Sequence, residues 1–168
     1  MAEEKEYEVL EEGNEIVASI RQRYPREFCN VVPEQVVVLV ITNFPRPFSM
    51  KKLAQITKVN PAHRTIIKRY GRKDVRYIIE VYLSDWSQWN PPRKQWIMAH
   101  ELGHIGSKNR KSLVQHDCQD FNWLLDAVGI MYWSKDNLPD ILTGQPFPFK
   151  TELFNIPEED DQDGDEQT

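Results

Sequence analysis

Apolar residues follow three patterns in the first half of the chain. Residues 35–42, "QVVVLVIT", form an unbroken β-branched run that fits either a buried strand or a short buried helical segment. Residues 53–59, "LAQITKV", alternate between apolar and polar side chains and predict a strand, and "NPAH" at 60–63 predicts a turn. Residues 75–83, "VRYIIEVYL", give the strongest strand pattern in the chain.

Apolar side chains recur at helical spacing near the N-terminus and again in the second half. Residues 5–24 predict an amphipathic helix that ends before Pro25. A helix is also predicted from Val114 to Val128. The stretch after it, up to residue 149, combines turn residues with aromatics and is expected to pack over the surface of the domain.

The helix with the clearest ends is predicted from about 91 to 105. Asn90 can accept hydrogen bonds from the free amides at its start, Pro91 suits the first helical position, and Gly106 can close its far end. Gly103 costs about 1 kcal/mol relative to alanine within a helix. We therefore expect another part of the chain to pack close to the backbone at Gly103.

This helix contains the motif "HELGH" at residues 100–104. One turn separates His100 from His104, so their Cβ atoms lie about 5–6 Å apart on one face and both imidazoles can bind one ion. Zinc suits two such imidazoles, and a catalytic site needs three protein ligands with a fourth position left for water. Glu101, rotated by about 100° from His100, is the candidate general base for that water. The other interpretation is an ordinary helix whose histidines bond to their neighbours.

His116, twelve residues after His104, is the candidate third ligand. A short loop would let the helix that it opens fold back beside the first. Asp117 could bind the metal instead, or could accept the N–H of a ligating histidine, and Asp120 could act in the same way. "HDCQD" could also be a helix N-terminus whose acidic side chains favour the helix dipole.

Other candidate residues are less well defined by their spacing. His63 is expected to be structural or to face phosphate. The oxyanion stabiliser of a hydrolase could be Arg76 or one of three tyrosines, Tyr77, Tyr82 and Tyr132. The strand at 75–83 could hold an extended peptide by main-chain hydrogen bonds, or it could be an interior strand of its own sheet.

Length and charge suggest how the chain is organised. Its 168 residues suit a single domain, which we assign to residues 1–150. Residues 151–168 have no lysine or arginine, and 157–168 carry seven acidic side chains, so this end is predicted to be a disordered acidic tail. Residues 51–76 hold nine Lys or Arg against Asp74. That stretch is either a solvated face or a weak nucleic-acid contact, and the tail could cover it in cis.

The chain contains no signal for secretion or for membrane insertion. No apolar run approaches the roughly 20 residues that span a bilayer, and the N-terminus is acidic, so we expect a cytoplasmic protein without a membrane partner. Cys29 and Cys118 are too few and too far apart for a disulfide framework and are expected to be free, buried thiols. The sequence does not indicate an oligomeric state.

The segments "YIIEVYLSDWSQW", "WIMAHELGHI", "QHDCQDF" and "LLDAVGIMYW" resemble the phage metallopeptidase family, over roughly residues 50–145. The resemblance implies an α+β, zincin-like domain, with a short mixed or antiparallel sheet packed against the H-E-x-x-H helix, a following helix and an N-terminal helix. It also implies that His100, His104 and His116 bind zinc and that Glu101 is the catalytic glutamate. The edge strand beside the cleft of a zincin would be residues 75–83.

Two functions of different class follow from these observations. The first is a zinc-dependent metallopeptidase that hydrolyses peptide bonds of a peptide or protein substrate, with Glu101 as general base. The alternative is a non-enzymatic, zinc-stabilised binding module whose basic face contacts nucleic acid or protein. A fourth coordination position filled by Asp117 or Asp120 would favour the module, because structural zinc sites leave no room for water.

Overall fold

The computed structural model describes residues 5–43, 45–47, 52–105, 113–116, 121–129 and 131–149. Gly106, Cys118 and the acidic tail at 151–168 lie outside these residues. Cys29 is a free thiol, as expected, but it is exposed rather than buried.

Four strands form one mixed sheet in the order β1-β2-β4-β3. The two central strands, β2 and β4, run parallel, whereas β1 pairs antiparallel with β2 and β3 pairs antiparallel with β4. The strands are β1 (Tyr7–Val9), β2 (Val36–Ile41), β3 (Ala54–Lys58) and β4 (Tyr77–Tyr82). The type of residues 35–42, which the sequence left open, is therefore strand, and the strand prediction for 53–59 is confirmed.

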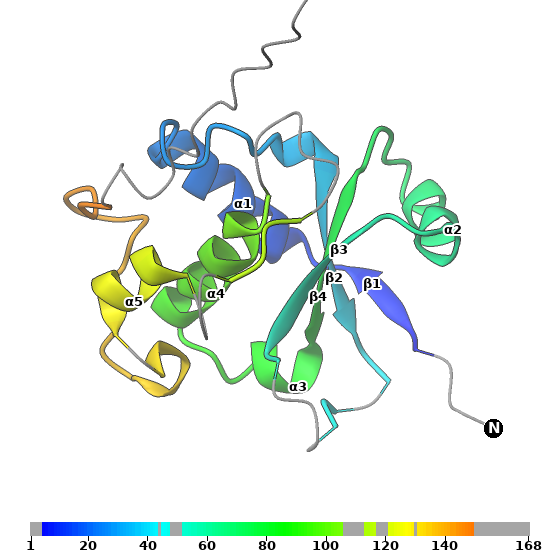
Figure 1. The fold of residues 1–168 in the computed structure, drawn as a ribbon. Coiled ribbons are helices and arrows are strands. Elements are labelled where there is room, and N and C mark those ends of the chain that lie inside the picture. The colour runs from blue at the N-terminus through cyan, green and yellow to red at the C-terminus, as the bar shows by residue number, and fades with distance from the viewer. Residues whose placement is uncertain are drawn as a thin grey trace, which may run out of the picture.

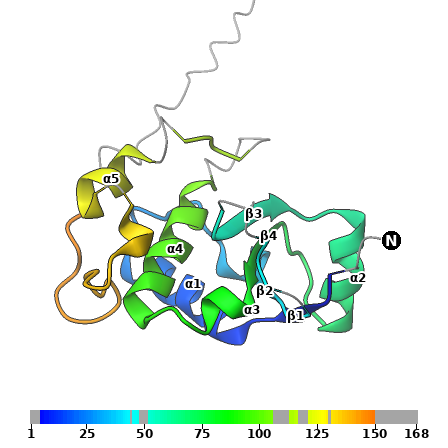
Figure 2. The same ribbon diagram turned by 90° about the horizontal axis from the view of Figure 1, so that it is seen from below.

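Helices cover both faces of the sheet. The mixed sheet, with two antiparallel pairs around one parallel pair, makes the fold α+β, as predicted. In Figures 1 and 2, α1 and α4 lie on one side of the sheet and α2 lies on the other. The helices are α1 (Glu11–Arg23), α2 (Pro61–Arg69), α3 (Leu83–Trp86), α4 (Pro91–Gly103) and α5 (Asn122–Val128). In the part of the chain that is described, no helix is both long enough and apolar enough to cross a membrane.

All six residues of β2 are buried, because helices pack on both of its faces. Val36, Val38 and Val40 join the larger apolar core with α1 and α4, whereas Val37 and Leu39 contact the α2 side. Residues 131–149 were expected to pack over the surface, yet they also enter the larger core through Leu138, Ile141 and Phe149. The turn-rich sequence therefore supplies part of the interior.

Two elements near turns differ from the sequence prediction. Tyr7–Val9, predicted as helix, is β1 and pairs with Leu39–Ile41, so α1 begins only at Glu11. Residues 60–63, predicted as a turn, begin α2: the Asn60 side chain accepts a hydrogen bond from the His63 N–H at 3.0 Å, and Pro61 occupies the first helical position. Asparagine followed by proline is the same start signal as in α4.

Two further predictions were wrong about where an element lies: the start of one helix and the place of one strand in the sheet. The helix predicted from Val114 begins at Asn122, because the backbone of Val114 pairs instead with the end of α4: its N–H donates to the His104 carbonyl at 2.8 Å. The strand within 75–83 is not an edge strand. It is β4, which lies between β2 and β3, and among the described strands β3 forms the sheet edge on that side.

Candidate metal centre

Helix α4 has one face buried in the core, and another face carries the two histidines of the motif. The Asn90 side chain accepts a hydrogen bond from the Arg93 N–H at 3.0 Å, and Pro91 starts the helix, as predicted. Met98, Ala99 and Leu102 are almost completely buried in the core. This packing fixes the rotation of α4 and directs its histidines away from the core.

Three histidines meet beside α4. The Nε2 atom of His116 lies 3.2 Å from the Nε2 atom of His100 and 3.2 Å from that of His104. One ligand nitrogen from each of the three lies within 4.8 Å of the others, so this group could hold a metal ion. Two of the three come from one helical turn, and His116 reaches them from segment 113–116, which is neither helix nor strand.

A pair of hydrogen bonds fixes the orientation of His104. Its Nδ1 atom lies 2.6 Å from the Val114 carbonyl oxygen, and the Val114 N–H donates to the His104 carbonyl at 2.8 Å. A carbonyl oxygen can only accept, so Nδ1 carries the proton and Nε2 presents a lone pair to the cluster. The same pair holds the segment that carries His116 against the end of α4.

Phe121 packs against all three imidazoles. Its ring centroid lies 5.5, 4.8 and 5.0 Å from those of His100, His104 and His116. It stacks on Trp123, with ring centroids 6.0 Å apart. A Cβ atom at Gly103 would lie only 3.0 Å from Phe121 and 3.2 Å from Trp123, which confirms the close packing expected at this glycine.

Glu101 is buried, with 5% of its surface exposed, and it contacts the edge strand. Its Oε2 atom accepts a hydrogen bond from the Ile56 N–H at 2.8 Å. The Ile56 N–H therefore points away from β4. The Val59 N–H donates to the Arg76 carbonyl, so the backbone groups of Val59 face β4. Backbone groups alternate in direction along a strand, so those of Ala54 and Lys58 point outward, like those of Ile56.

A cleft of about 560 Å³ runs between β3 and the three histidines. Residues 52–58 form one wall, and the other is formed by α4, by His116 with its neighbours, and by Tyr132. The sequence missed the part played by β3 and by Phe121. An alternating strand is visible in the sequence, but its position at the edge of the sheet depends on pairing with distant residues.

The structure separates the other predicted site residues. Of the four oxyanion candidates, Tyr132 lines the cleft, whereas Arg76 and Tyr77 line a different groove and Tyr82 is not among the lining residues. His63 lies on α2, where its Nε2 atom is 3.0 Å from Glu80, so it is structural. The predicted alternatives to His116 lie outside the described residues; they are Asp117 and Asp120.

Comparison with known families agrees with this site. Residues 4–142 match the model of a family described as "Putative phage metallopeptidase". The chain belongs to this family. No curated protein and no solved structure matches it with significance.

Membership of the phage metallopeptidase family implies a metal ion, and the cluster of His100, His104 and His116 could hold one. The matched region contains all of the described helices and strands, and it extends from the segment before β1 to the turn that follows Ile141. The matched region therefore includes the described fold and the histidine cluster.

Proposed function

We propose that the protein is a zinc-dependent metallopeptidase in which His100, His104 and His116 bind the zinc ion and Glu101 is the general base. Three imidazole nitrogens converge beside a cleft that is bounded by an edge strand, and this observation carries the proposal. The Nε2 atom of His116 lies 3.2 Å from the Nε2 atom of each of the other two histidines.

The donor set suits zinc. Nitrogen ligands at about 2.05 Å from a tetrahedral ion are about 3.3 Å from one another, close to the two 3.2 Å separations. Three neutral imidazoles leave the fourth position for water, and a bound zinc ion would lower the pKa of that water and polarise the substrate carbonyl. Glu101 would take a proton from that water as the water oxygen attacks the carbonyl, and would pass the proton to the amine that leaves when the peptide bond breaks.

Edge strand β3 is the proposed substrate-binding element. The outward backbone groups of Ala54 and Lys58 can pair with an extended peptide, which then runs along the cleft. We assign oxyanion stabilisation to Tyr132, since it is the one of the four candidates that lines the cleft.

Metal content and peptidase activity of matched variants test the proposal. Wild type and Glu101→Gln should each hold about one zinc per chain by elemental analysis after purification without a metal-affinity resin. His100→Ala and His116→Ala should lose it, whereas His63→Gln, which alters a histidine outside the cluster, should retain it. Glu101→Gln keeps an oxygen that can accept from the Ile56 N–H, so its fold should be preserved.

Activity distinguishes the enzyme from the binding module. Zinc-loaded wild type should cleave casein or a mixture of fluorogenic peptides, and Glu101→Gln should lose at least about 100-fold in rate. Failure of wild type to bind zinc, or equal cleavage by wild type and Glu101→Gln, would overturn the proposed mechanism. Zinc binding without any cleavage would favour the non-enzymatic module.

A further inference from the structure

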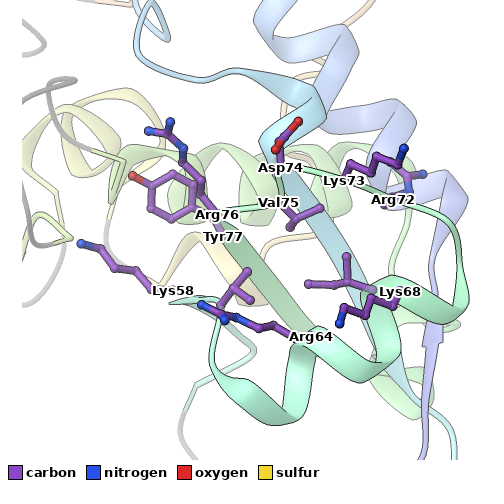
Figure 3. Close-up of a pocket in the computed structure, with 11 residues that line it drawn as sticks. Lys58, Arg64, Lys68, Arg72, Lys73, Asp74, Val75, Arg76 and Tyr77 are labelled. Carbon is purple, nitrogen blue, oxygen red and sulfur yellow. The ribbon is translucent and has the colours of Figure 1, made fainter.

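A second groove, lined with positive charge, lies between α2 and the start of β4. Its volume is about 790 Å³. Figure 3 shows its cationic side chains around one hollow. They are Lys58, Arg64, Lys68, Arg72, Lys73 and Arg76.

These six cations have little compensating charge nearby. Asp74 is the acidic residue among the lining residues, and Arg72 forms an ion pair with Glu11 at 2.8 Å. Within the described part of the chain, no ion pair joins the other five to an acidic side chain. The whole chain has a net charge of -5, so the groove concentrates charge of the opposite sign.

The cations come from separate segments that are anchored to the sheet. Arg64 and Lys68 lie one turn apart on α2 and share a face. Arg76 lies directly before β4: its N–H donates to Gln35 at 2.8 Å, and its carbonyl accepts from Val59 at 2.9 Å. The side chains therefore line a concave surface whose backbone is held in place.

The floor of the groove is apolar. Ile67 is buried there, and Val59 and Val75 are partly buried beside it, whereas the side chain of Tyr77, another lining residue, packs against the larger core. Cations around an apolar surface suit a polymer that carries phosphates and flat, partly apolar bases. Three of the six cations are arginines, which match phosphate with paired hydrogen bonds.

We propose that this groove binds nucleic acid through its phosphate backbone. An acidic peptide, such as residues 151–168 of this chain, supplies negative charge but no flat bases for the floor. Lys58 lines both the groove and the histidine cleft. If the proposed peptidase function holds, the groove would bring proteins that are bound to nucleic acid to the cleft.

Fluorescence anisotropy with a labelled 20-nucleotide single strand and the matching duplex, measured over a series of KCl concentrations, tests the proposal. We expect the full-length protein to bind one or both. Arg64→Ala/Lys68→Ala should weaken binding at low salt at least about tenfold, and should reduce the slope of log K against log salt by about 1.4 for the single strand or about 1.8 for the duplex.

A control variant of equal net charge is Arg26→Ala/Arg69→Ala, which removes two exposed arginines that do not line the groove. It should leave the slope unchanged. The proposal is overturned if neither DNA binds, if both double variants change the slope equally, or if a peptide of residues 151–168 binds more tightly than either DNA. Binding is measured without catalysis, so these outcomes are independent of the proposed peptidase function.

Discussion

The substitution Gly103→Ala tests how closely the aromatic residues support the three histidines. The added Cβ atom would lie 3.0 Å from Cε2 of Phe121 and 3.2 Å from Cζ2 of Trp123. Both rings are buried, and each is part of the larger core. A rigid aromatic ring cannot move aside as the end of a flexible side chain could, so the contact must be relieved by a shift of Phe121 or of α4.

Two opposing effects set the magnitude. Alanine gains up to about 1 kcal/mol over glycine in a helix, and less at Gly103 because it is the last residue of α4. Overpacking of a core costs about 1–3 kcal/mol. We expect a net destabilisation of about 1 kcal/mol. Because Phe121 contacts all three imidazoles, we also expect zinc affinity to fall about tenfold or more, as for other groups that support metal ligands.

The assay has two readouts, urea denaturation of the metal-free protein and zinc competition with a chromophoric chelator. Gly13→Ala is the matched control. Its Cβ would lie 2.7 Å from Val38 at the contact of α1 with β2, so it should also destabilise the fold. It adds no atom near the histidines and should leave zinc affinity unchanged. If Gly103→Ala instead raises stability and binds zinc like wild type, the packing argument is wrong.

Three other predictions concern the fold and its metal. His63→Ala should destabilise the protein by about 1–3 kcal/mol in urea denaturation, because it removes a buried side chain and one of the hydrogen bonds to Glu80, which also accepts from Lys5 and Tyr7. An unchanged midpoint would contradict a structural role for His63. Burial raises the pKa of Glu12, but its hydrogen bonds, including the one from Lys94, outweigh burial and hold that pKa below 4.5. Ionised Glu12 therefore stabilises the fold above about pH 4.5, and this contribution is lost as the pH falls through the folded-state pKa. Glu12→Gln should make the drop in the free energy of unfolding in acid smaller, by less than about 1 kcal/mol. EDTA should lower the Tm of zinc-loaded wild type and leave that of His116→Ala unchanged. Free zinc at about 100 times its Kd adds about 2.7 kcal/mol to the free energy of unfolding, and a chain that does not bind zinc cannot lose this contribution.

Local signals in the sequence predicted the elements that depend on local structure. Asn90, Pro91 and the apolar positions after them define α4, and the same asparagine–proline signal marks α2 at Asn60 and Pro61. The turn predicted at 60–63 was wrong because proline after asparagine was taken to end structure, whereas here it begins a helix.

The errors elsewhere come from contacts between distant residues. Tyr7–Val9 alternates between apolar and polar residues, but three residues are too few to distinguish a strand from the start of a helix, and the segment becomes β1 by pairing with β2. Segment 113–116 was included in a predicted helix, but the backbone of Val114 is hydrogen-bonded to His104 and the segment is not helical. The place of β4 inside the sheet is likewise fixed by its two neighbours.

The features of the candidate site divide in the same way, into those that local sequence predicts and those that depend on contacts between distant residues. One helical turn brings His100 and His104 together, so the sequence alone predicts that pair. The position of His116 depends on how the chain returns to α4, so the sequence suggested the residue as a ligand but predicted the wrong local structure around it. The hydrogen bond of Glu101 to Ile56 could not be predicted, because it joins residues that are 45 positions apart.

That hydrogen bond also bears on the solubility of the protein. An exposed sheet edge invites pairing with the edge of another copy, which leads to aggregation. The middle amide of β3 is already bound to Glu101, and Lys52 and Lys58 flank the strand with positive charge. A Glu101→Leu variant would free that amide and should aggregate more than Glu101→Gln. The glutamate proposed for catalysis thus also keeps the edge strand from joining two molecules into a continuous sheet.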